Sequence, residues 1–425
     1  MQVQVAGHSG LLPVEWKKKQ FTHRSEKEGV MRKKKWLRII ICVILAAIVC
    51  RGIVSAITQK RYAAIPCEFV MPEGFSLPDS RLVAIGTATH GNGDPFLAAL
   101  AVLREMYAAH GNVALILEEN VGDAETVGLQ HAYSGELGEN VGFYLIYENK
   151  EMADILKWLE ENNQRLYGID IQNIQAVADR LCGRLTELGF AEAKNMALAA
   201  VNKTDIADHL PLLDEIDHFL KGRYDSGALS EREYCYLLHQ TDCVRQNYEY
   251  RLAEDRHFDI RDKAMAQNAA WVMDYEQRFY GNDYAVLLAS NGHVVKTPWA
   301  YDNAYVGGTF CPAGVTLSKE LEKNYFVIIT DAAESYFVAG IGNGQNHQKI
   351  FHIDRKDLLL SVNGSGYFTA QELSNMGHTN WDMTMVGATT TDIQTWNKKW
   401  YAVPVSVPES FDAMLFSTRM TAVHR

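Results

Sequence analysis

The side chains best suited to acid–base chemistry stand directly after short apolar runs of the sequence. His90 lies in the segment GTATHG (86–91), Glu118 follows the run LIL, and His293 lies in ASNGHV (289–294). An imidazole titrates close to working pH, and a neighbouring carboxylate can orient it or share its proton. These residue types therefore indicate general acid–base chemistry, with a histidine that activates water.

The apolar runs alternate with longer segments of helical period, which predicts strands connected by helices. Such alternation favours an α/β fold with a mainly parallel sheet covered by helices on both faces. Ligands of such sheets bind beyond the carboxyl ends of the strands, where the polar residues are found. The predicted strands are Leu82–Ile85, Val113–Leu117, Leu166–Ile169, Ala285–Leu288, Tyr325–Ile329 and Ala413–Phe416. The helix-like stretches are 95–110, 123–133, 151–163 and 174–188.

A long segment of the chain lacks any strand pattern. Residues 190–280 contain no convincing β-branched run, so we expect a helical insertion there. It ends in a predicted helix, about 262–279, that carries one apolar stripe. The sheet and its insertion together form one domain predicted at 81–420.

Charge is unevenly distributed along the 425 residues. The net charge is −11, but the first 61 residues carry 13 Lys or Arg against three Asp or Glu, so the remainder sums to −11 − 10 = −21. This acidic body argues against nucleic acid as a partner, because duplex binding depends on Lys and Arg that neutralise phosphates. We expect a small-molecule substrate instead.

The sequence has no dense cluster of His, Cys and carboxylates at metal-ligand spacing, although His90, Glu118 and His293 could converge on an ion. Its seven cysteines lack the close paired spacing of zinc ligands, and Cys235 and Cys243 would lie about 12 Å apart on a helix, so we expect buried free thiols. His347 and His352 lack a carboxylate at the spacing expected of metal ligands, so they are interpreted as loop residues. There is no G-x-S-x-G, H-E-x-x-H, P-loop or G-x-G-x-x-G motif. We therefore expect no metal and no cofactor.

An apolar N-terminal segment predicts attachment to a membrane. Residues 39–57 form an apolar stretch of about the length of a span, interrupted by Arg51 and preceded by a basic tail (1–38). The basic flank keeps the N-terminus in the cytoplasm, so the body, after a linker at 58–80, is expected outside the cell membrane. Cleavage as a signal peptide after the small residues 54–56, which would release the body, stays open.

The ordered segments resemble the erythromycin esterase-like family, whose members show G-E-A-T-H-G, a strand that ends in Glu, G-F-D-M-Q, R-D-x-x-M-x-x-N and A-H-N-x-H-V. The last strand of the family is similar to PESFDAMLF (408–416). The resemblance spans roughly residues 80 to 418. The matching segments are GTATHG (86–91), LILEENVGDA (115–124), GIDIQ (168–172), RDKAMAQN (261–268) and ASNGHV (289–294).

The resemblance implies an ester hydrolase, with a macrolactone as one conceivable substrate. His90 would be the base that activates water, with Glu118 orienting it, and Arg261 and His293 would polarise the carbonyl or stabilise the oxyanion. Glu119 competes with Glu118 for its role, and Arg261 could instead do no more than begin a helix. The residues expected to bind substrate are Thr87, Asp94, Glu119, Asp170, Gln172, Asn268 and Asn291.

Two departures from the family pattern keep other functions open. The glutamate of the first motif is Thr87 here, and the first histidine of A-H-N-x-H is Ser290. The family's similarity in fold to haem- and iron-binding lipoproteins allows a crevice that binds a ligand without turnover. A membrane tether also allows an accessory role in envelope polysaccharide assembly. The sequence names no substrate.

The charge pattern leads to a prediction about topology. A reporter that is active only outside the cytoplasm, fused after Arg425, should be active, because the Lys and Arg before residue 39 hold the N-terminus inside. The control is the same fusion with the basic residues 32–35 changed to Gln, which should weaken that orientation. Activity of a cytoplasm-only reporter at Arg425 would contradict the predicted topology.

Overall fold

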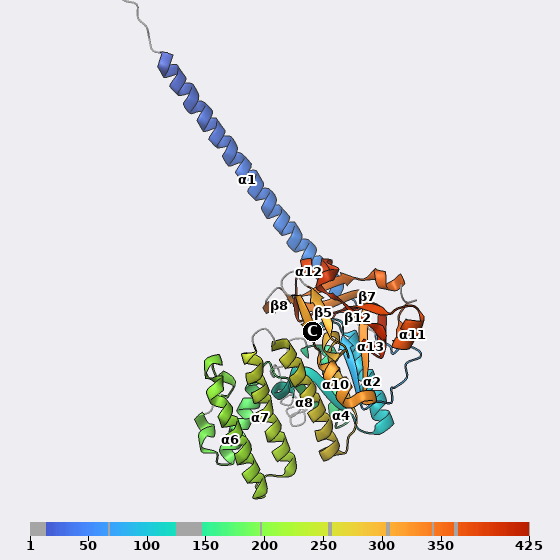
Figure 1. Cartoon of the computed structure of the whole chain (residues 1–425). Helices are drawn as coiled ribbons and strands as arrows, with labels where there is room; N and C mark the ends of the chain where they lie inside the picture. The colour runs from blue at the N-terminus through green and yellow to red at the C-terminus, as the bar shows by residue number, and fades with distance from the viewer. Residues whose placement is uncertain are drawn as a thin grey trace, which may run out of the picture. The chain divides into compact units, whose positions relative to one another are not determined.

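The computed structural model describes residues 14–66, 69–124, 147–195, 198–253, 257–302, 307–341, 344–360 and 364–424. The chain divides into two compact units, Met1–Arg61 and Tyr62–Arg425 (Figure 1). All the buried core residues of the described chain lie between residues 82 and 423. The second unit therefore has a hydrophobic core of its own, as a domain does.

The described part of the first unit is one helix. α1 runs from Val14 to Ala63, so it also covers most of the basic tail and the beginning of the expected linker. Lys, Glu and Arg, which have high helix propensity, dominate the sequence of its first half. Among the described residues, Ile39–Ala63 is the one stretch long and apolar enough to cross a membrane, judged by length and composition alone.

A nine-stranded sheet organises the described part of the second unit. Its strand order is β3-β2-β4-β1-β7-β13-β9, with β8 and β11 also paired to β7. The pairs within β3-β2-β4-β1-β7-β13 are parallel, which confirms the expected mainly parallel α/β fold. The six predicted strands are present, most of them longer: β1 Leu82–Thr87, β2 Ala114–Asn120, β3 Leu166–Asp170, β4 Ala285–Ser290, β7 Tyr325–Ile341 and β13 Ala413–Met420.

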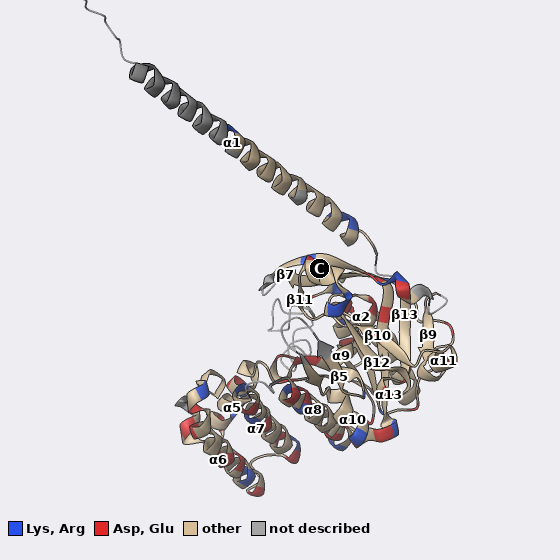
Figure 2. Ribbon diagram, turned by 45° about the horizontal axis from the view of Figure 1, so that its top comes forward, with Lys and Arg blue, Asp and Glu red and all other residues tan. Residues whose placement is uncertain are grey.

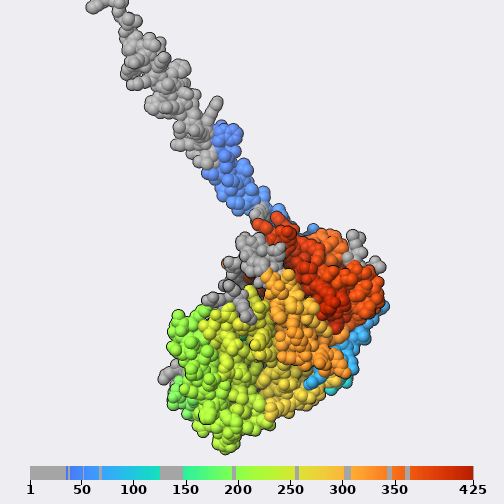
Figure 3. All heavy atoms as spheres, viewed as in Figure 1, coloured from blue at the N-terminus to red at the C-terminus, as the bar shows by residue number. Residues whose placement is uncertain are grey.

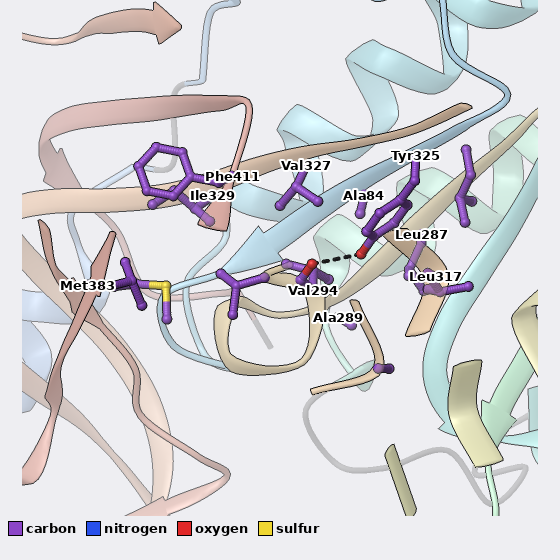
Figure 4. Packing of buried hydrophobic residues seen from close by; sticks show 14 of the residues in the cluster. Ala84, Leu287, Ala289, Val294, Leu317, Tyr325, Val327, Ile329, Met383 and Phe411 are labelled. Atoms are coloured by element: carbon purple, nitrogen blue, oxygen red, sulfur yellow. Dashed lines mark hydrogen bonds between the residues drawn. The ribbon is translucent and has the colours of Figure 1, made fainter. Parts of the chain in front are cut away.

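Helices cover both faces of this sheet, as the continuous apolar runs require. On one face, α2 (Asp94–His110) and α4 (Lys150–Glu161) pack against alternate strand residues such as Val83 and Leu115. On the other, α8 (His257–Tyr280) and α10 (Ala313–Leu321) pack against residues such as Ala84 and Leu287. In this second layer the hydroxyl of Tyr325 donates to the carbonyl oxygen of Val294 at 2.7 Å (Figure 4).

The insertion is helical throughout its described residues, as expected. After α5 (Gln175–Glu187) come three short 3₁₀ turns, then α6 (Ile206–Asp225), α7 (Glu231–Leu252) and α8. Their shared apolar core forms a separate cluster, and Figure 3 shows this green-to-yellow lobe packed against the orange part of the same unit. Basic and acidic residues are interspersed along α6, α7 and α8 (Figure 2). Cys235 and Cys243 both lie on α7.

Several helices and strands, most of them short, were not predicted from the sequence. They are α9 Asn291–Val294, β5 Trp299–Asp302, β6 Gly307–Phe310, β8 Gly344–Asp354, β9 Gly366–Thr369, α11 Ala370–Asn375, β10 Asn380–Thr384, β11 Thr389–Thr390, α12 Asp392–Trp396, β12 Ala402–Ser406 and α13 Val407–Ser410. The interpretation of His347 and His352 as loop residues was wrong, because both lie in β8, which pairs antiparallel with the long β7. Most of the predicted helix 123–133 lies outside the described residues.

A buried carboxylate joins the end of α8 to the sheet and leads to a prediction about stability. Glu276 accepts from Arg165 (2.5 and 2.7 Å), Tyr167 (2.5 Å) and Asn282 (2.7 Å). Glu276→Ala removes the shared acceptor, so denaturant unfolding of residues 62–425 should show a loss of about 3 kcal/mol, the low end for a broken buried pair because Arg165 is partly exposed. The matched control is Glu161→Ala, since the Lys157–Glu161 pair is well exposed and should contribute under about 1 kcal/mol. Equal losses in the two variants would show that the buried network contributes no more than a surface pair.

Candidate active site

The predicted chemical residues meet at the carboxyl ends of four neighbouring strands. β3, β2, β4 and β1 lie side by side in that order, and Asp170, Glu118, His293 and His90 lie at or just beyond their respective ends. Parallel strands present their carboxyl ends at one edge, so residues distant in sequence become neighbours. The residues of the site come together because the order of the strands in the sheet differs from their order in the sequence.

A bulge in β2 aims Glu118 into this edge. Leu117 pairs with Gly168 but Asn120 pairs with Asp170, so three steps along β2 correspond to two along β3. Such a bulge bends the strand and redirects a side chain. It also explains Gly168, because a Cβ there would lie 2.5 Å from the carbonyl oxygen of Asn120 and 2.6 Å from that of Glu119. Gly168 of the GIDIQ motif therefore leaves room for the bulged backbone of β2.

Arg261, from the first part of α8, is buried between two carboxylates. Its Nε and Nη2 atoms donate to Asp170 (3.0 and 2.7 Å), and Nη2 also donates to Oε1 of Glu118 (3.0 Å). Glu118 is itself buried and accepts from the backbone N–H of Ser290 at 2.8 Å. Burial alone would raise the pKa of Glu118, but the charges and hydrogen bond of His293, with help from His90 and Arg261, hold it well below its usual range. Glu118 is therefore a carboxylate at any working pH.

His293 stands between two carboxylates. Its Nδ1 lies 2.7 Å from Oδ1 of Asp262 and its Nε2 lies 3.1 Å from Oε1 of Glu118. Burial lowers the pKa of His293, but the two carboxylates outweigh it and raise the pKa to about 10. The imidazolium form donates from both nitrogens, which makes the 3.2 Å approach of Arg261 Nη1 to Nε2 a close contact between two donors. His293 is thus a fixed cation.

His90 occupies a tight turn between β1 and α2. Gly91, its neighbour, lies against β7, where a Cβ would come within 1.9 Å of the carbonyl oxygen of Val338. The hydroxyl of Thr89 donates to Asn92 (2.6 Å), and Val386 donates its backbone N–H to Ala88 (2.9 Å). These contacts fix the backbone on both sides of His90, which is itself partly exposed.

The two histidines of the site differ in charge. Burial lowers the pKa of His90 from 6.5, and the nearby cations His293 and Arg261 lower it further, against an opposing effect of Glu118. His90 is therefore neutral at pH 7 while His293 is protonated. Two titratable groups whose environments separate their pKa values are the arrangement that acid–base chemistry needs. A base and a fixed positive charge stand in one site.

The residues expected to bind substrate lie at the same edge, and several have partners within the protein. Asp94 accepts from the backbone and hydroxyl of Thr421, Asn268 donates to the carbonyl of Ile169, and Asn291 bridges Thr330 and Thr384. Gln172 is exposed and contacts the hydroxyl of Tyr250, and Glu119, fully buried, accepts from the N–H of Asn120.

Thr87 is different from these residues. It is buried beside Ser290 in the β1–β4 register, and its hydroxyl has no hydrogen-bond partner among the described residues. It lies where the family motif has a carboxylate. A contact between substrate and any residue of this set stays a prediction.

Sequence reasoning missed two contributors to the site. Asp262 positions His293 and also accepts from the backbone N–H of Ala313 (2.9 Å). The backbone N–H of Ser290 holds Glu118, although the side chain at that position departs from the family. The adjacent acid in RDKAMAQN was the available signal for Asp262. No side-chain pattern could reveal a backbone donor.

No group of three or more His, Cys, Asp or Glu residues in the described chain has the geometry of a metal site. The carboxylates at the site are instead engaged by Arg261, His293 and backbone N–H groups. The expectation that the site works without a metal or a cofactor stays a prediction.

Comparison with known proteins places these features in context. The family model described as erythromycin esterase matches residues 108–420. That match begins after β1, so the GTATHG turn with His90 lies outside it. No curated protein sequence matches the chain.

Three solved structures resemble most of the chain in fold. A Bacillus cereus protein has a TM-score of 0.66 at 18% identity, covering 87% of this chain and 99% of its own. A succinoglycan biosynthesis protein has a TM-score of 0.62 at 14% identity, covering 86% and 98%. A mutant of the erythromycin esterase EreC in its open conformation has a TM-score of 0.56 at 14% identity, covering 81% and 92%. At these identities the similarity shows the fold alone.

The opposed histidines lead to a prediction that NMR can check. With ¹⁵N-labelled histidine, His293 should carry protons on both nitrogens at pH 8 and titrate at about 10, whereas His90 should stay neutral down to below 6.5. Asp262→Asn should lower the pKa of His293, because it removes one of the two carboxylates that stabilise the cation. Glu161→Gln, an exposed change on α4, is the control and should alter neither value. If His293 titrates near 6.5 in the folded protein, the network does not hold it as a cation.

Proposed function

This chain belongs to the erythromycin esterase family, and we propose that it hydrolyses carboxylic esters with water activated by His90. The observation that carries the proposal is the placement of His90 and His293 beyond the ends of the neighbouring strands β1 and β4, where His293 lies 3.1 Å from the buried carboxylate of Glu118. These surroundings lower the pKa of His90 and raise that of His293, so the first is neutral and the second protonated. A neutral imidazole can accept a proton, and the fixed cation can stabilise a developing negative charge. A site with only the neutral base, or with only the cation, would supply one of these two functions.

In the proposed reaction, His90 removes a proton from water as the water oxygen bonds to the ester carbonyl carbon. The carbonyl π electrons move to oxygen, and the resulting oxyanion is stabilised by the positive charges of His293 and Arg261. When the carbonyl re-forms, the carbon–oxygen single bond to the alcohol breaks, and the alcohol oxygen takes the proton from His90. Hydrolysis of a macrolactone by the same steps would open its ring into one hydroxy acid. No acyl-enzyme is required.

The other charged residues act by positioning. Asp170 and Glu118 occupy the Nε and Nη2 edges of Arg261, and Nη1 lies 3.2 Å from Nε2 of His293. Arg261 therefore acts on a substrate oxygen through the positive charge that it adds beside His293. Asp262 fixes the ring of His293 through Nδ1. Glu118 holds Nε2 of the same ring and its field acts on His90. Preorganised charges of this kind need no rearrangement during the reaction.

We place the catalytic unit outside the cell membrane, held by the apolar part of α1. The support is the length and composition of Ile39–Ala63 together with the basic residues that precede it. Release of the body by cleavage remains the alternative. Either arrangement would expose the site to extracellular esters.

A second candidate function is binding of an ester-bearing ligand, such as an envelope polysaccharide, without turnover. The supporting observation is Thr87, whose buried hydroxyl replaces the carboxylate of the family motif and has no partner among the described residues. A ligand oxygen would complete that hydroxyl's hydrogen bonding. Turnover of an ester by the purified protein separates this candidate from the first.

The proposed base can be tested by substitution. His90→Ala should lower kcat on a chromogenic ester by about 10²–10⁴-fold with little change in KM, because a positioned base acts only in the transition state. The control, His110→Ala, removes an exposed imidazole at the end of α2 and should leave kcat unchanged. Retention of full turnover by a folded His90→Ala protein would remove His90 from the mechanism.

Restoring the family carboxylate gives a second test. Thr87→Glu places an acid three residues before His90, beside Ser290, and should raise kcat on a generic ester by orienting the imidazole or relaying its proton. Thr87→Gln is the matched control, since it has the same shape without the charge and should give no increase. A loss of folding stability without any gain in kcat would instead favour the binding function, because the buried carboxylate would have found no partner.

A further inference from the structure

The second unit exposes large apolar side chains on one short helix. In α12, Ile393 is 71% exposed and Trp396 is 80% exposed, the latter more than any other aromatic residue named among the exposed apolar side chains. The two residues are three apart, so they share one face of the helix. Ile341, at the end of β7, is 47% exposed. We call Ile341, Ile393 and Trp396 the α12 patch.

The fold brings the three residues of the α12 patch to one end of the unit. Thr390, in β11, pairs with Ile341, so α12 begins within two residues of that contact. α12 lies against β8, as Figure 1 shows, and Lys349 of β8 binds Asp392 at 2.6 Å. The helix that carries the exposed face is therefore packed on the sheet.

The strands β7 and β8 also contact the chain where it leaves the apolar segment. The ring of Tyr62, the first residue of the second unit, lies 4.8 Å from that of Tyr336 in β7 and 6.1 Å from that of His352 in β8. Tyr336 precedes Ile341 by five residues, a distance of about 17 Å along a strand. The point of attachment and the α12 patch thus lie near one another on the same pair of strands.

The tether leaves little room between that attachment and a bilayer. Tyr62 follows Ile57, the last residue of the apolar segment predicted at 39–57, by five residues, and the chain between them is helical, which spans about 8 Å. The headgroup layer outside each face of the hydrocarbon core is roughly 5–8 Å thick. Tyr62 would therefore lie at the outer edge of the headgroups, together with the residues of β7 and β8 that its ring contacts.

The charges near the α12 patch suit an interfacial contact that does not depend on anionic lipid. Lys349 is paired with Asp392, and Lys398 lies 2.6 Å from Asp382 and 3.3 Å from Asp357. The acidic second unit, with its net charge of −21 (28 Lys or Arg against 49 Asp or Glu), would not be attracted to an anionic surface. Trp side chains favour the membrane–water interface because the ring is amphipathic.

We propose that the α12 patch inserts into the interfacial layer of the membrane that holds α1, giving the catalytic unit a second point of attachment. The inference rests on the membrane tether of the proposed function and adds the surface that meets the lipid. Two attachments fix the orientation of the unit on the bilayer, where one tether would leave it free to turn. An amphipathic surface of this kind reaches about 5–10 Å into the headgroup and acyl boundary.

The test uses the full chain reconstituted in phosphatidylcholine vesicles. Ile393→Cys, in a background whose other accessible cysteines are serine, is labelled with an environment-sensitive fluorophore. Met376→Cys is the matched control, since Met376 is also exposed (45%) but lies next to α11. The label at position 393 should shift to shorter wavelength, gain intensity several-fold, and be quenched by brominated lipid, whereas the label at 376 should show none of these changes.

The outcomes separate the inference from the function on which it rests. Resistance to carbonate extraction first shows that the full chain is integrated in the vesicles. If it is integrated and the label at 393 behaves like the label at 376, the α12 patch does not touch lipid and the inference is wrong, although the tether stands. If the label responds equally without lipid at high protein concentration, a second copy covers the α12 patch and the inference is also wrong. Loss of the 393 response on adding Trp396→Gln would support the inference.

Discussion

The two ion pairs that Arg261 makes, with Glu118 and with Asp170, are the interactions on which the rest of the site depends. All three side chains are buried, so each charge needs the others, and removal of one would leave an uncompensated charge inside the protein. The pairs join α8 of the insertion to β2 and β3 of the sheet. They also fix Glu118, which together with Asp262 keeps His293 protonated, and the charge of His293 adds to burial in lowering the pKa of His90. The chemistry of the site follows from this chain of electrostatic effects.

The backbone supplies the geometry that these charges require. The bulge in β2 turns Glu118 toward Arg261, and Gly168 admits the bulged carbonyl groups from the neighbouring strand. Gly91 allows the His90 turn to lie directly on β7. Close approach of backbone to backbone is a reason for glycine that does not involve its torsion angles. Three motifs of the sequence are thus explained by packing as well as by chemistry.

Much of the fold could be predicted because parallel strands buried on both faces read as continuous apolar runs. Glu118, Arg261 and His293 could be found because they follow such runs or begin a patterned helix. The short strands β8 to β12 were missed, since they carry polar and aromatic residues without a strong period and are stabilised by partners distant in sequence. His352 was misread for that reason. The roles of Asp262 and of the Ser290 backbone depend on three-dimensional contacts that no local pattern records.

The pH dependence of kcat/KM on a chromogenic ester tests the central claim most directly. His90 acts as a base only when it is neutral, and its pKa is lowered, so activity should fall only below pH 6.5. His293 acts only when it is protonated, and its pKa is raised to about 10, so activity should decline only near pH 10. The account predicts a broad plateau between these limits. A narrow bell with its basic limb near neutral pH, in a protein that stays folded, would contradict it.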